Sequence, residues 1–163
     1  MHVREIAEQD CENLAALSMY VWLHTYAKDG IRDNISKFVL STFTGNKFRE
    51  TVKSSTKSGF AALSNEHIIG VVIVDLESRF RKTSTFGYEI ETLYVHPGFQ
   101  GRGVGRMLLD RLGTSIGSRS WLTTWVQNYD AIEFYKKNGY QIVGEVEFKL
   151  LNESHLNHVL SNI

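Results

Sequence analysis

Apolar residues follow two different periods along this chain. In the first third they recur every three or four positions, which is typical of helices with one face against a core. After a polar break at residues 53–58, apolar and β-branched residues instead form short continuous runs, which are typical of strands. The first third predicts a short strand over residues 3–6 and helices over residues 10–26, 33–40 and 48–52. Asp10 is a candidate side-chain cap for the first of these helices.

The rest of the chain alternates predicted strands with two amphipathic helices. Strands are predicted over residues 59–63, 68–76, 86–95, 121–126, 140–144 and 146–151, with a hairpin turn at residues 64–66. One helix carries apolar residues along a single face at Val104, Leu108, Leu112 and Ile116. A second helix begins at the cap residue Asn128 and ends before Gly139, a candidate left-handed cap. This order of elements predicts one α/β domain over residues 1–163, with a mixed sheet covered by helices.

Composition restricts the class of protein. The chain has 163 residues, of which 42% are hydrophobic and 22% are charged, as expected for one globular domain. Its 18 basic and 18 acidic residues leave no overall positive field that would recruit nucleic acid or a membrane surface. Cys11 is the only cysteine, which excludes an intramolecular disulfide, and no apolar run has signal-peptide or membrane-spanning character. We therefore expect a cytoplasmic protein without nucleic-acid or membrane partners. The sequence leaves open whether it is a monomer or a homodimer.

The most informative segment is a glycine-rich loop between a predicted strand and a predicted helix. The strand stops at Pro97, and glycines then alternate at Gly101, Gly103 and Gly105. Glycine lets backbone N–H groups approach a ligand closely, and N–H groups at a helix N-terminus attract phosphate. Arg106 stands where a dinucleotide-binding loop needs its last glycine, and the absence of Gly-Lys-Ser/Thr excludes a P-loop. The segment is therefore either a phosphate loop of another kind or an ordinary glycine-rich turn.

Two motifs resemble those of the GCN5-related N-acetyltransferase family. Residues 93–109 read Leu-Tyr-Val-His-Pro-Gly-Phe-Gln-Gly-Arg-Gly-Val-Gly-Arg-Met-Leu-Leu, and they contain a match to the family's pyrophosphate loop, Gln/Arg-x-x-Gly-x-Gly/Ala. Residues 128–140 are similar to its Asn-x-x-Ala-x-x-Phe-Tyr-x-x-x-Gly-Phe segment. The resemblance covers essentially the whole chain and implies a mostly antiparallel sheet of about six or seven strands. Segments 14–26 and 89–95 resemble, more loosely, bacterial small-amine (polyamine-type) acetyltransferases.

The resemblance implies acetyl-coenzyme A (acetyl-CoA) as donor and direct transfer to an amine, without a covalent acyl-enzyme. Asn128 would lie near the pantetheine arm and Tyr135 near the sulfur. The main chain of Leu93, Tyr94 and Val95 would pair with the arm, and the pyrophosphate would be held by Gln100, Gly101, Arg102, Gly103, Val104 and Gly105. The implied acceptor is the primary amine of a small molecule. The alternatives are a protein N-terminus or lysine side chain, and a sensor that binds acyl-CoA without transfer.

Transfer to an amine calls for a base and an acid. Glu89 and Glu91 are expected on one strand face with Leu93, because strand side chains repeat every two residues. Two nearby carboxylates raise one another's pKa, which favours one as general base; the alternatives are a solvated face or attraction for a cationic substrate. Tyr135 is the candidate general acid, since a phenol pKa of about 10 is close to that of a thiol; the alternative is a core tyrosine.

The acceptor side is less well defined by the sequence. Trp22 and Tyr26 are four residues apart, so they share a helix face and could wall an acceptor pocket that faces an ammonium group. The alternative for this pair is ordinary core packing. His155 and His158 have no acidic or cysteine partner at metal-ligand spacing, so no metal site is predicted.

Overall fold

Seven strands form one mixed sheet with five α-helices on its faces, which confirms the predicted α/β class. The computed structural model describes residues 1–163, the whole chain. The strands are β1 (His2–Glu5), β2 (Lys57–Ser64), β3 (His67–Asp75), β4 (Tyr88–Val95), β5 (Ser120–Trp125), β6 (Gln141–Leu150) and β7 (Glu153–Ser161). The helices are α1 (Cys11–Tyr26), α2 (Asp33–Thr42), α3 (Gly45–Lys53), α4 (Val104–Ser115) and α5 (Tyr129–Lys137). None of the helices combines the length and apolar character needed to cross a membrane.

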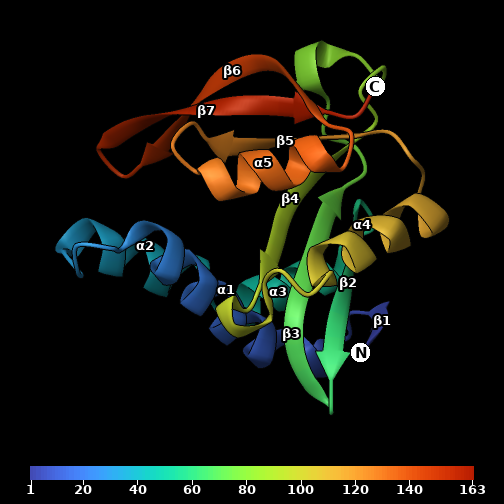
Figure 1. The fold of residues 1–163 in the computed structure, drawn as a ribbon. Helices are drawn as coiled ribbons and strands as arrows, with labels where there is room; N and C mark the ends of the chain where they lie inside the picture. Colours follow the sequence, from blue (N-terminus) through green and yellow to red (C-terminus); the bar gives the residue numbers. More distant parts are fainter.

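The sheet divides into two halves between β4 and β5. Its strand order is β1-β2-β3-β4-β5-β7-β6, and every neighbouring pair is antiparallel except β4 with β5. These two parallel strands pair only at Tyr88 with Ser120 and at Glu89 with Trp121. Beyond that point they separate, and Figure 1 shows β5, β6 and β7 lying across the upper end of β2, β3 and β4. The sheet therefore contains a fork between β4 and β5.

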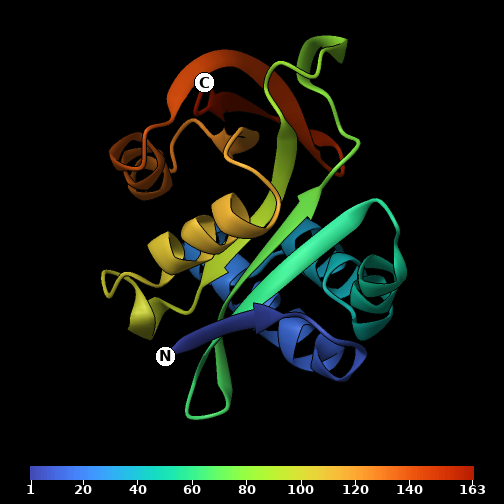
Figure 2. The ribbon, with the colours of Figure 1, turned by 90° about the vertical axis from the view of Figure 1, so that its right-hand side faces the viewer.

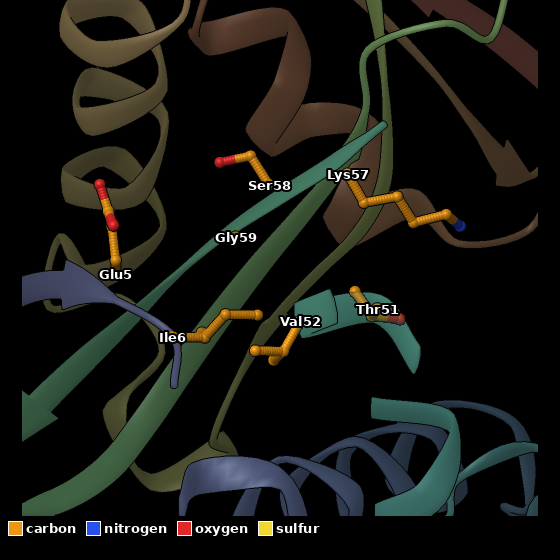
Figure 3. Close-up of a pocket in the computed structure, with 7 residues that line it drawn as sticks. All are labelled: Glu5, Ile6, Thr51, Val52, Lys57, Ser58 and Gly59. Atoms are coloured by element: carbon orange, nitrogen blue, oxygen red, sulfur yellow. The ribbon is translucent and has the colours of Figure 1, made fainter. Parts of the chain in front are cut away.

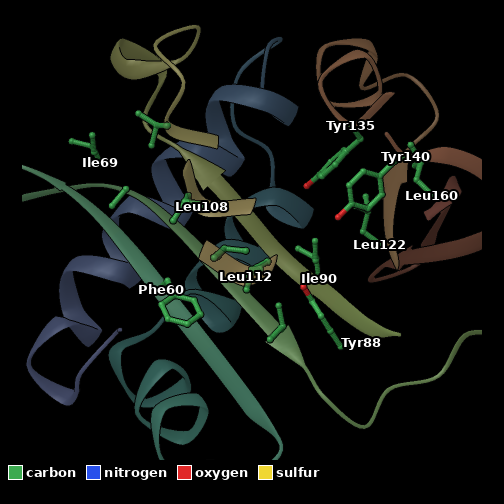
Figure 4. Close-up of a cluster of buried hydrophobic side chains, with 14 residues drawn as sticks. Phe60, Ile69, Tyr88, Ile90, Leu108, Leu112, Leu122, Tyr135, Tyr140 and Leu160 are labelled. Atoms are coloured by element: carbon green, nitrogen blue, oxygen red, sulfur yellow. The ribbon is translucent and has the colours of Figure 1, made fainter. Parts of the chain in front are cut away.

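Helices cover both faces of the first half-sheet. α1 and α3 pack on one face of β2, β3 and β4, and α4 packs on the other (Figure 2). The cluster beneath α4 includes Phe60, Ile69, Val72, Val74, Ile90, Leu108 and Leu112 (Figure 4). The cluster beneath α1 and α3 includes Leu14, Leu17, Val21, Phe48, Val71 and Ile73. Because alternate residues of β3 enter opposite clusters, this strand has a continuous apolar run in the sequence.

The second half-sheet is covered less completely. α5 packs on Leu122 of β5 and Leu160 of β7, on the same face as α4, whereas nearly all of β6 is exposed or half-buried at the sheet edge. The prediction of two strands over residues 140–144 and 146–151 is wrong, because β6 continues through Gly144 with a bulge beside it. The sequence analysis also misses β7, whose residues 153–158 are mostly polar and have little strand character by pattern alone.

Most local turn signals are confirmed. Asn65 and Glu66 have positive φ angles of 47° and 65° in the hairpin turn between β2 and β3. Asn128 caps α5 by accepting a hydrogen bond from the N–H of Ala131 at 3.4 Å. Gly139 follows α5 with a φ of 89°, as a left-handed cap requires. These features depend on residues close in sequence, so a local pattern is enough to predict them.

Asp10 is an exception among the predicted caps. Its side chain makes no capping hydrogen bond to α1. The carboxylate instead accepts two hydrogen bonds from the Arg4 guanidinium, at 2.7 and 2.9 Å, and one from the N–H of Ala7 at 2.8 Å. The Arg4 guanidinium is the main reason that the pKa of Asp10 lies below its usual range. A charged partner from β1 therefore replaces the helix N-terminus as the group that Asp10 binds.

Candidate active site

The fork leaves two strand edges without strand partners. β3 occupies one edge of β4, and β7 occupies one edge of β5. Because β4 and β5 pair only as far as Glu89 and Trp121, residues 90–95 and 122–125 face each other across a gap in the ladder. An extended molecule with amide groups can bind such an edge through main-chain hydrogen bonds, as an added strand does. The predicted arm-binding residues 93–95 lie on this unpaired part of β4.

The glycine-rich loop connects the end of β4 to α4. A short 3-10 turn (Pro97–Phe99) follows β4, and the N–H of Gln100 is donated to the carbonyl of Pro97 at 3.3 Å. Met107 is the first residue of α4 whose N–H reaches a backbone carbonyl, that of Gly103 at 3.0 Å. The N–H groups of residues 101–106 have no backbone acceptor. They therefore form a run of free donors at the positive end of a helix.

The three loop glycines do not play the same part. Gly101 and Gly103 have φ angles of 73° and 83°, and a Cβ at either position would meet open space. A left-handed backbone is what requires glycine there, and the space above the loop is free for a ligand. Gly105 differs, because a Cβ at this position would lie 2.8 Å from Cζ of Phe134 in α5. The third glycine therefore allows α4 and α5 to approach closely.

Side chains around the loop hold it against β4 and α5. The Gln100 side-chain amide donates to the carbonyl of Val95 at 3.2 Å. The Arg102 guanidinium lies over the Phe99 ring, 5.2 Å from its centroid, close to the free N–H groups. Arg106 donates to Asp110 at 2.8 Å and to the Asn138 side chain at 3.2 Å, so it links α4 to the end of α5. Of the two arginines, only Arg102 lacks a carboxylate partner.

Tyr135 of α5 is buried in the cluster beneath α4, with 6% of its surface exposed. Figure 4 shows its hydroxyl directed away from α5 toward β4. The neighbouring Tyr140 hydroxyl makes a 2.6 Å hydrogen bond with Ser120, whereas the Tyr135 hydroxyl has no hydrogen-bond partner in the chain. Burial, followed by the nearby tyrosines 140, 94 and 26, raises the pKa of Tyr135 above its ordinary value. Tyr135 is thus a protonated phenol with its proton unused, although the raised pKa no longer matches that of a thiol, which is the basis of the sequence prediction.

A β-bulge in β4 changes the expected arrangement of the two glutamates. Thr92 pairs with Ile73 and Ile90 pairs with Val74, which leaves Glu91 as an extra residue without a partner on β3. Ile90 and Leu93 consequently pack in the same cluster beneath α4. The expectation that Leu93 shares a face with Glu89 and Glu91 is therefore wrong. An inserted residue shifts the two-residue period of a strand, and no local pattern marks where this happens.

The environments of the two glutamates differ. Both carboxylate oxygens of Glu91 accept hydrogen bonds from the Lys57 ammonium at 2.7 Å. Glu89 has no cationic partner; it is half-buried and accepts a 2.5 Å hydrogen bond from the Ser78 hydroxyl. Burial is the main reason that the pKa of Glu89 is raised, and the nearby carboxylates of Glu91 and Asp75 raise it further. Glu89 therefore has the character of a general base, while Glu91 is held as half of an ion pair.

Trp22 and Tyr26 share a helix face, with ring centroids 4.8 Å apart, but their surroundings differ. Trp22 is 6% exposed and packs with Ile35, Val39 and Leu150 in a core cluster. Tyr26 is half-buried, and its ring lies 5.8 Å from that of Trp125 at the end of β5. Burial raises the pKa of Tyr26, and a hydrogen bond with Asn128 opposes this shift. Only Tyr26 has a partly open ring beside the second half-sheet.

Two cavities lie away from the fork. One, of about 140 Å³, lies between β1, α3 and β2 and is lined in part by Lys57 (Figure 3). The other, of about 340 Å³, lies between α1 and the turn joining β2 to β3. His155 and His158 project from opposite faces of β7, and no cluster of three metal-ligating side chains is present. The chemistry-bearing groups gather instead at the fork.

Comparisons with known proteins identify the family to which the chain belongs. The family model described as "Acetyltransferase (GNAT) domain" matches residues 56–142. An uncharacterized N-acetyltransferase encoded in the pepI 3′ region of Lactobacillus delbrueckii subsp. lactis is 24% identical over 162 residues, covering 96% of this chain and 93% of that protein. The N-alpha-acetyltransferase RimI of Mycobacterium tuberculosis is 40% identical over 68 residues, covering 41% of this chain and 43% of RimI.

Solved structures agree on the fold. The PaiA N-acetyltransferase of Thermoplasma acidophilum, solved in complex with coenzyme A, superposes with a TM-score of 0.77 at 19% identity, covering 97% of this chain and 96% of that one. The family match spans more than half of this chain, from β2 to the start of β6, and includes the glycine-rich loop, the fork and Tyr135. The protein belongs to the GNAT family of acetyl-CoA-dependent N-acetyltransferases.

Proposed function

We propose that this protein transfers the acetyl group of acetyl-CoA directly to the primary amine of a small molecule. The observation that carries the proposal is the placement of two groups on opposite faces of the sheet. Tyr135 lies on the face covered by α4 and α5. Glu89 lies on the opposite face, because successive strand residues alternate between faces and its neighbour Ile90 packs beneath α4. The fork is the break in the sheet between them. A donor in the fork would therefore meet an acid on one face and a base on the other.

The donor fits the residues around the fork. The free N–H groups of residues 101–106 and the open space above Gly101 and Gly103 suit a diphosphate. Arg102 is placed to add a charge-assisted hydrogen bond. The unpaired edge over residues 93–95 suits the amide-containing arm, which Asn128, at the start of α5, would also contact. Acetyl-CoA supplies an activated acetyl group on a sulfur, and the residues of the chain orient it and move protons.

Each candidate residue then has a separate task. Glu89 would remove a proton from the attacking amine, directly or through a water molecule, because its carboxylate is not neutralised by a cation. Tyr135 would give its unused hydroxyl proton to the departing thiolate. Backbone N–H groups of residues 93–95 would polarise the reacting carbonyl. Glu91, bound to Lys57, would shape the field around Glu89 and take no proton.

A small acceptor is favoured by contacts that close one end of this region. The Arg32 guanidinium, just before α2, donates to both carboxylate oxygens of Glu153 at the start of β7, at 2.6 and 2.8 Å. Phe38 of α2 also lies against Phe148 of β6, with ring centroids 6.1 Å apart. We call these contacts the α2–β7 clasp. A peptide acceptor would have to pass between α2 and the β6–β7 turn, and the clasp joins these two segments.

A protein amine is the second candidate, because of the named activities of two relatives. RimI is an N-alpha-acetyltransferase, and YjaB of Salmonella typhimurium, a peptidyl-lysine N-acetyltransferase, is 36% identical over 63 residues that cover 41% of YjaB. A sensor that binds acyl-CoA without transfer is the third. The free Tyr135 hydroxyl and the unneutralised Glu89 have no use in such a sensor.

A thiol-release assay with acetyl-CoA separates these candidates. The panel contains small monoamines, polyamines, amino acids and aminoglycosides, together with peptides that present a free N-terminus or a lysine. We expect the highest kcat/KM with a small monoamine, and thiol release in equal amount to acetylated amine. A preference for peptides would establish the second candidate. Calorimetric binding of acetyl-CoA with no turnover on any acceptor would establish the third.

A further inference from the structure

One face of the second half-sheet joins the proposed base to the α2–β7 clasp. Residues paired across strands share a face, so Glu89 and Trp121 lie on the same side, turned away from α4 and α5. Further along β5, Trp125 pairs with Asn157 of β7. We call this side of β5, β7 and β6 the inner face. Its residues beyond the fork include Thr123, Trp125, His155, Asn157, Val146 and Phe148.

Asn157 has an unsatisfied polar group at the centre of the inner face. The residue is 8% exposed, and its Oδ1 atom is buried and accepts no hydrogen bond. Its cross-strand neighbours are Trp125 on one side, which is half-buried, and Val146 on the other, which is exposed. Buried amide oxygens in proteins are nearly always paired, so an unpaired one needs an explanation. A hydrogen-bond donor on a bound ligand would supply the missing partner.

The surroundings of Asn157 are aromatic. The Trp125 ring lies 5.8 Å from that of Tyr26 and 6.3 Å from that of His155. Phe148, which pairs with His155 across β6 and β7, is 38% exposed. Glu89 is level with Trp121 and Asn157 is level with Trp125, so the two lie about 13 Å apart along β5 at the usual rise of a strand. An arylalkylamine can span this distance when one water molecule joins its amine to the Glu89 carboxylate.

We call the line from the fork to Asn157 along the inner face the acceptor path. Charge is distributed unevenly along the acceptor path. At the fork end, Glu89, Glu91 and Asp75 share one cation, Lys57. At the far end, the Glu153 carboxylate accepts hydrogen bonds from Arg32 and Asn34, and it lies 3.3 Å from the His155 ring nitrogen. The far end therefore has no carboxylate free to balance a second ammonium group. An acceptor fits best with its cationic amine at the fork and an uncharged polar group beside Asn157.

We propose that Asn157 selects the acceptor by accepting a hydrogen bond from an uncharged hydroxyl or amide N–H at the end remote from the reacting amine. The acceptor class is accordingly a monocationic primary amine with an aromatic or apolar body, rather than a polyamine. This inference rests on the proposed function, because it assumes that the amine reacts at the fork. It adds a specificity-determining residue from β7, a strand that the sequence pattern does not reveal.

Matched amines test the proposal. Tyramine and phenethylamine differ by one hydroxyl group, and spermidine represents the polyamines. We expect the wild-type kcat/KM for tyramine to exceed that for phenethylamine by about fivefold to tenfold, the usual worth of one hydrogen bond, and to exceed that for spermidine. In Asn157→Leu, the KM for tyramine should rise by the same factor, while the KM values for phenethylamine and acetyl-CoA stay unchanged. Asn13→Leu, on the exposed side of α1, is the matched control.

The same variants separate binding from structure. If Asn157 is merely an unsatisfied core residue, Asn157→Leu raises the melting temperature and leaves every KM unchanged, which overturns the proposal. Preference for spermidine also overturns it. If no amine is acetylated, the proposed function fails, and calorimetry with tyramine in the presence of coenzyme A still tests Asn157. Binding of tyramine that Asn157→Leu weakens would support the inference on its own, and the absence of binding would refute it.

Discussion

The two halves of the sheet differ in how they are covered and in what they contribute. β2 and β3 are buried on both faces by α1, α3 and α4, whereas most residues of β6 are exposed. The first half carries the glycine-rich loop and the unpaired edge of β4, which fit the donor. The second half carries Trp125, Asn157 and Glu153, which surround the proposed acceptor path.

The family match overlaps this division only in part. The matched residues 56–142 contain β2 to β5, α4 and α5, but not α1, α2 or β7. Arg32 and Asn157, which we assign to the acceptor, therefore lie outside the matched range, whereas Trp125 lies inside it. A closely packed half can hold the common donor, while a less covered half can vary with the acceptor. The predictions below test whether donor and acceptor functions separate along the fork.

The largest effect is expected where the two halves meet, at Tyr135. Replacing Tyr135 by Phe removes the hydroxyl proton and keeps the buried ring, so the cluster beneath α4 should remain intact. We expect kcat to fall by about 100-fold or more, in the range of general acid catalysis, with no change in acetyl-CoA affinity. Steady-state kinetics and calorimetry measure the two quantities. Equal turnover in the two proteins would remove the acid role.

The next effect compares the two glutamates of β4. Glu89→Gln should lower kcat/KM by about 100-fold, whereas Glu91→Gln, which removes one half of an ion pair, should cost less than tenfold. Because burial raises the pKa of Glu89, wild-type activity should fall as the pH drops through that raised value, where the base takes up a proton. This fall in activity at low pH should be absent from the pH–rate profile of Glu89→Gln. A larger loss in Glu91→Gln would reverse the assignment.

A smaller effect is expected in the donor half, at the glycine-rich loop. In Gly103→Ala, a φ of 83° costs the alanine about 1–2 kcal/mol, so the free loop should relax away from the conformation that presents its N–H groups. Restoring that conformation on binding should lower acetyl-CoA affinity by about tenfold. Gly113→Ala is the control, since Gly113 lies in α4 with open space around it. That change should leave affinity unaltered and stabilise the fold by about 0.5–1 kcal/mol. Calorimetry and denaturant unfolding follow the two variants; equal affinities would contradict the loop's role.

The smallest effect is expected in the acceptor half, at the α2–β7 clasp. Arg32→Ala removes an exposed ion pair, so global stability should hardly change. Opening this end should let longer amines or peptides enter. We expect their kcat/KM to rise a few-fold, which corresponds to about 1 kcal/mol or less of activation free energy. Arg79→Ala, whose guanidinium binds only nearby carbonyls, is the control. A changed acetyl-CoA affinity in Arg32→Ala would show that donor and acceptor functions do not separate as proposed.

The Arg32–Glu153 pair also has a pH signature. Hydrogen bonds from Arg32 are the largest cause that lowers the pKa of Glu153 from its ordinary 4.5 to about 2. The ion pair is therefore fully formed above pH 4.5 and is lost as the pH falls toward 2, where the carboxylate is protonated. The contact between Phe38 and Phe148 has no titratable group, so it does not share this pH dependence.

Much of the fold follows from the sequence, because its signals are local. The helical spacing in the first third, the hairpin turn at Asn65 and Glu66, and the cap of Asn128 all depend on residues within one or two turns of each other. The glycine-rich loop is recognisable for the same reason. A positive φ or a free helix N-terminus needs only its own few residues, whatever the rest of the chain does.

Only the tertiary structure decides how the site is assembled. Three features depend on segments far apart in the sequence. They are the bulge at Glu91, the ion pair of Glu91 with Lys57, and the different surroundings of the Trp22 and Tyr26 rings. β7 is similar, since it gains its strand character by pairing with β5 and β6 rather than from its own polar residues. Backbone conformation at a turn is set by neighbouring side chains, whereas strand register and charge pairing are set by whichever partner lies alongside.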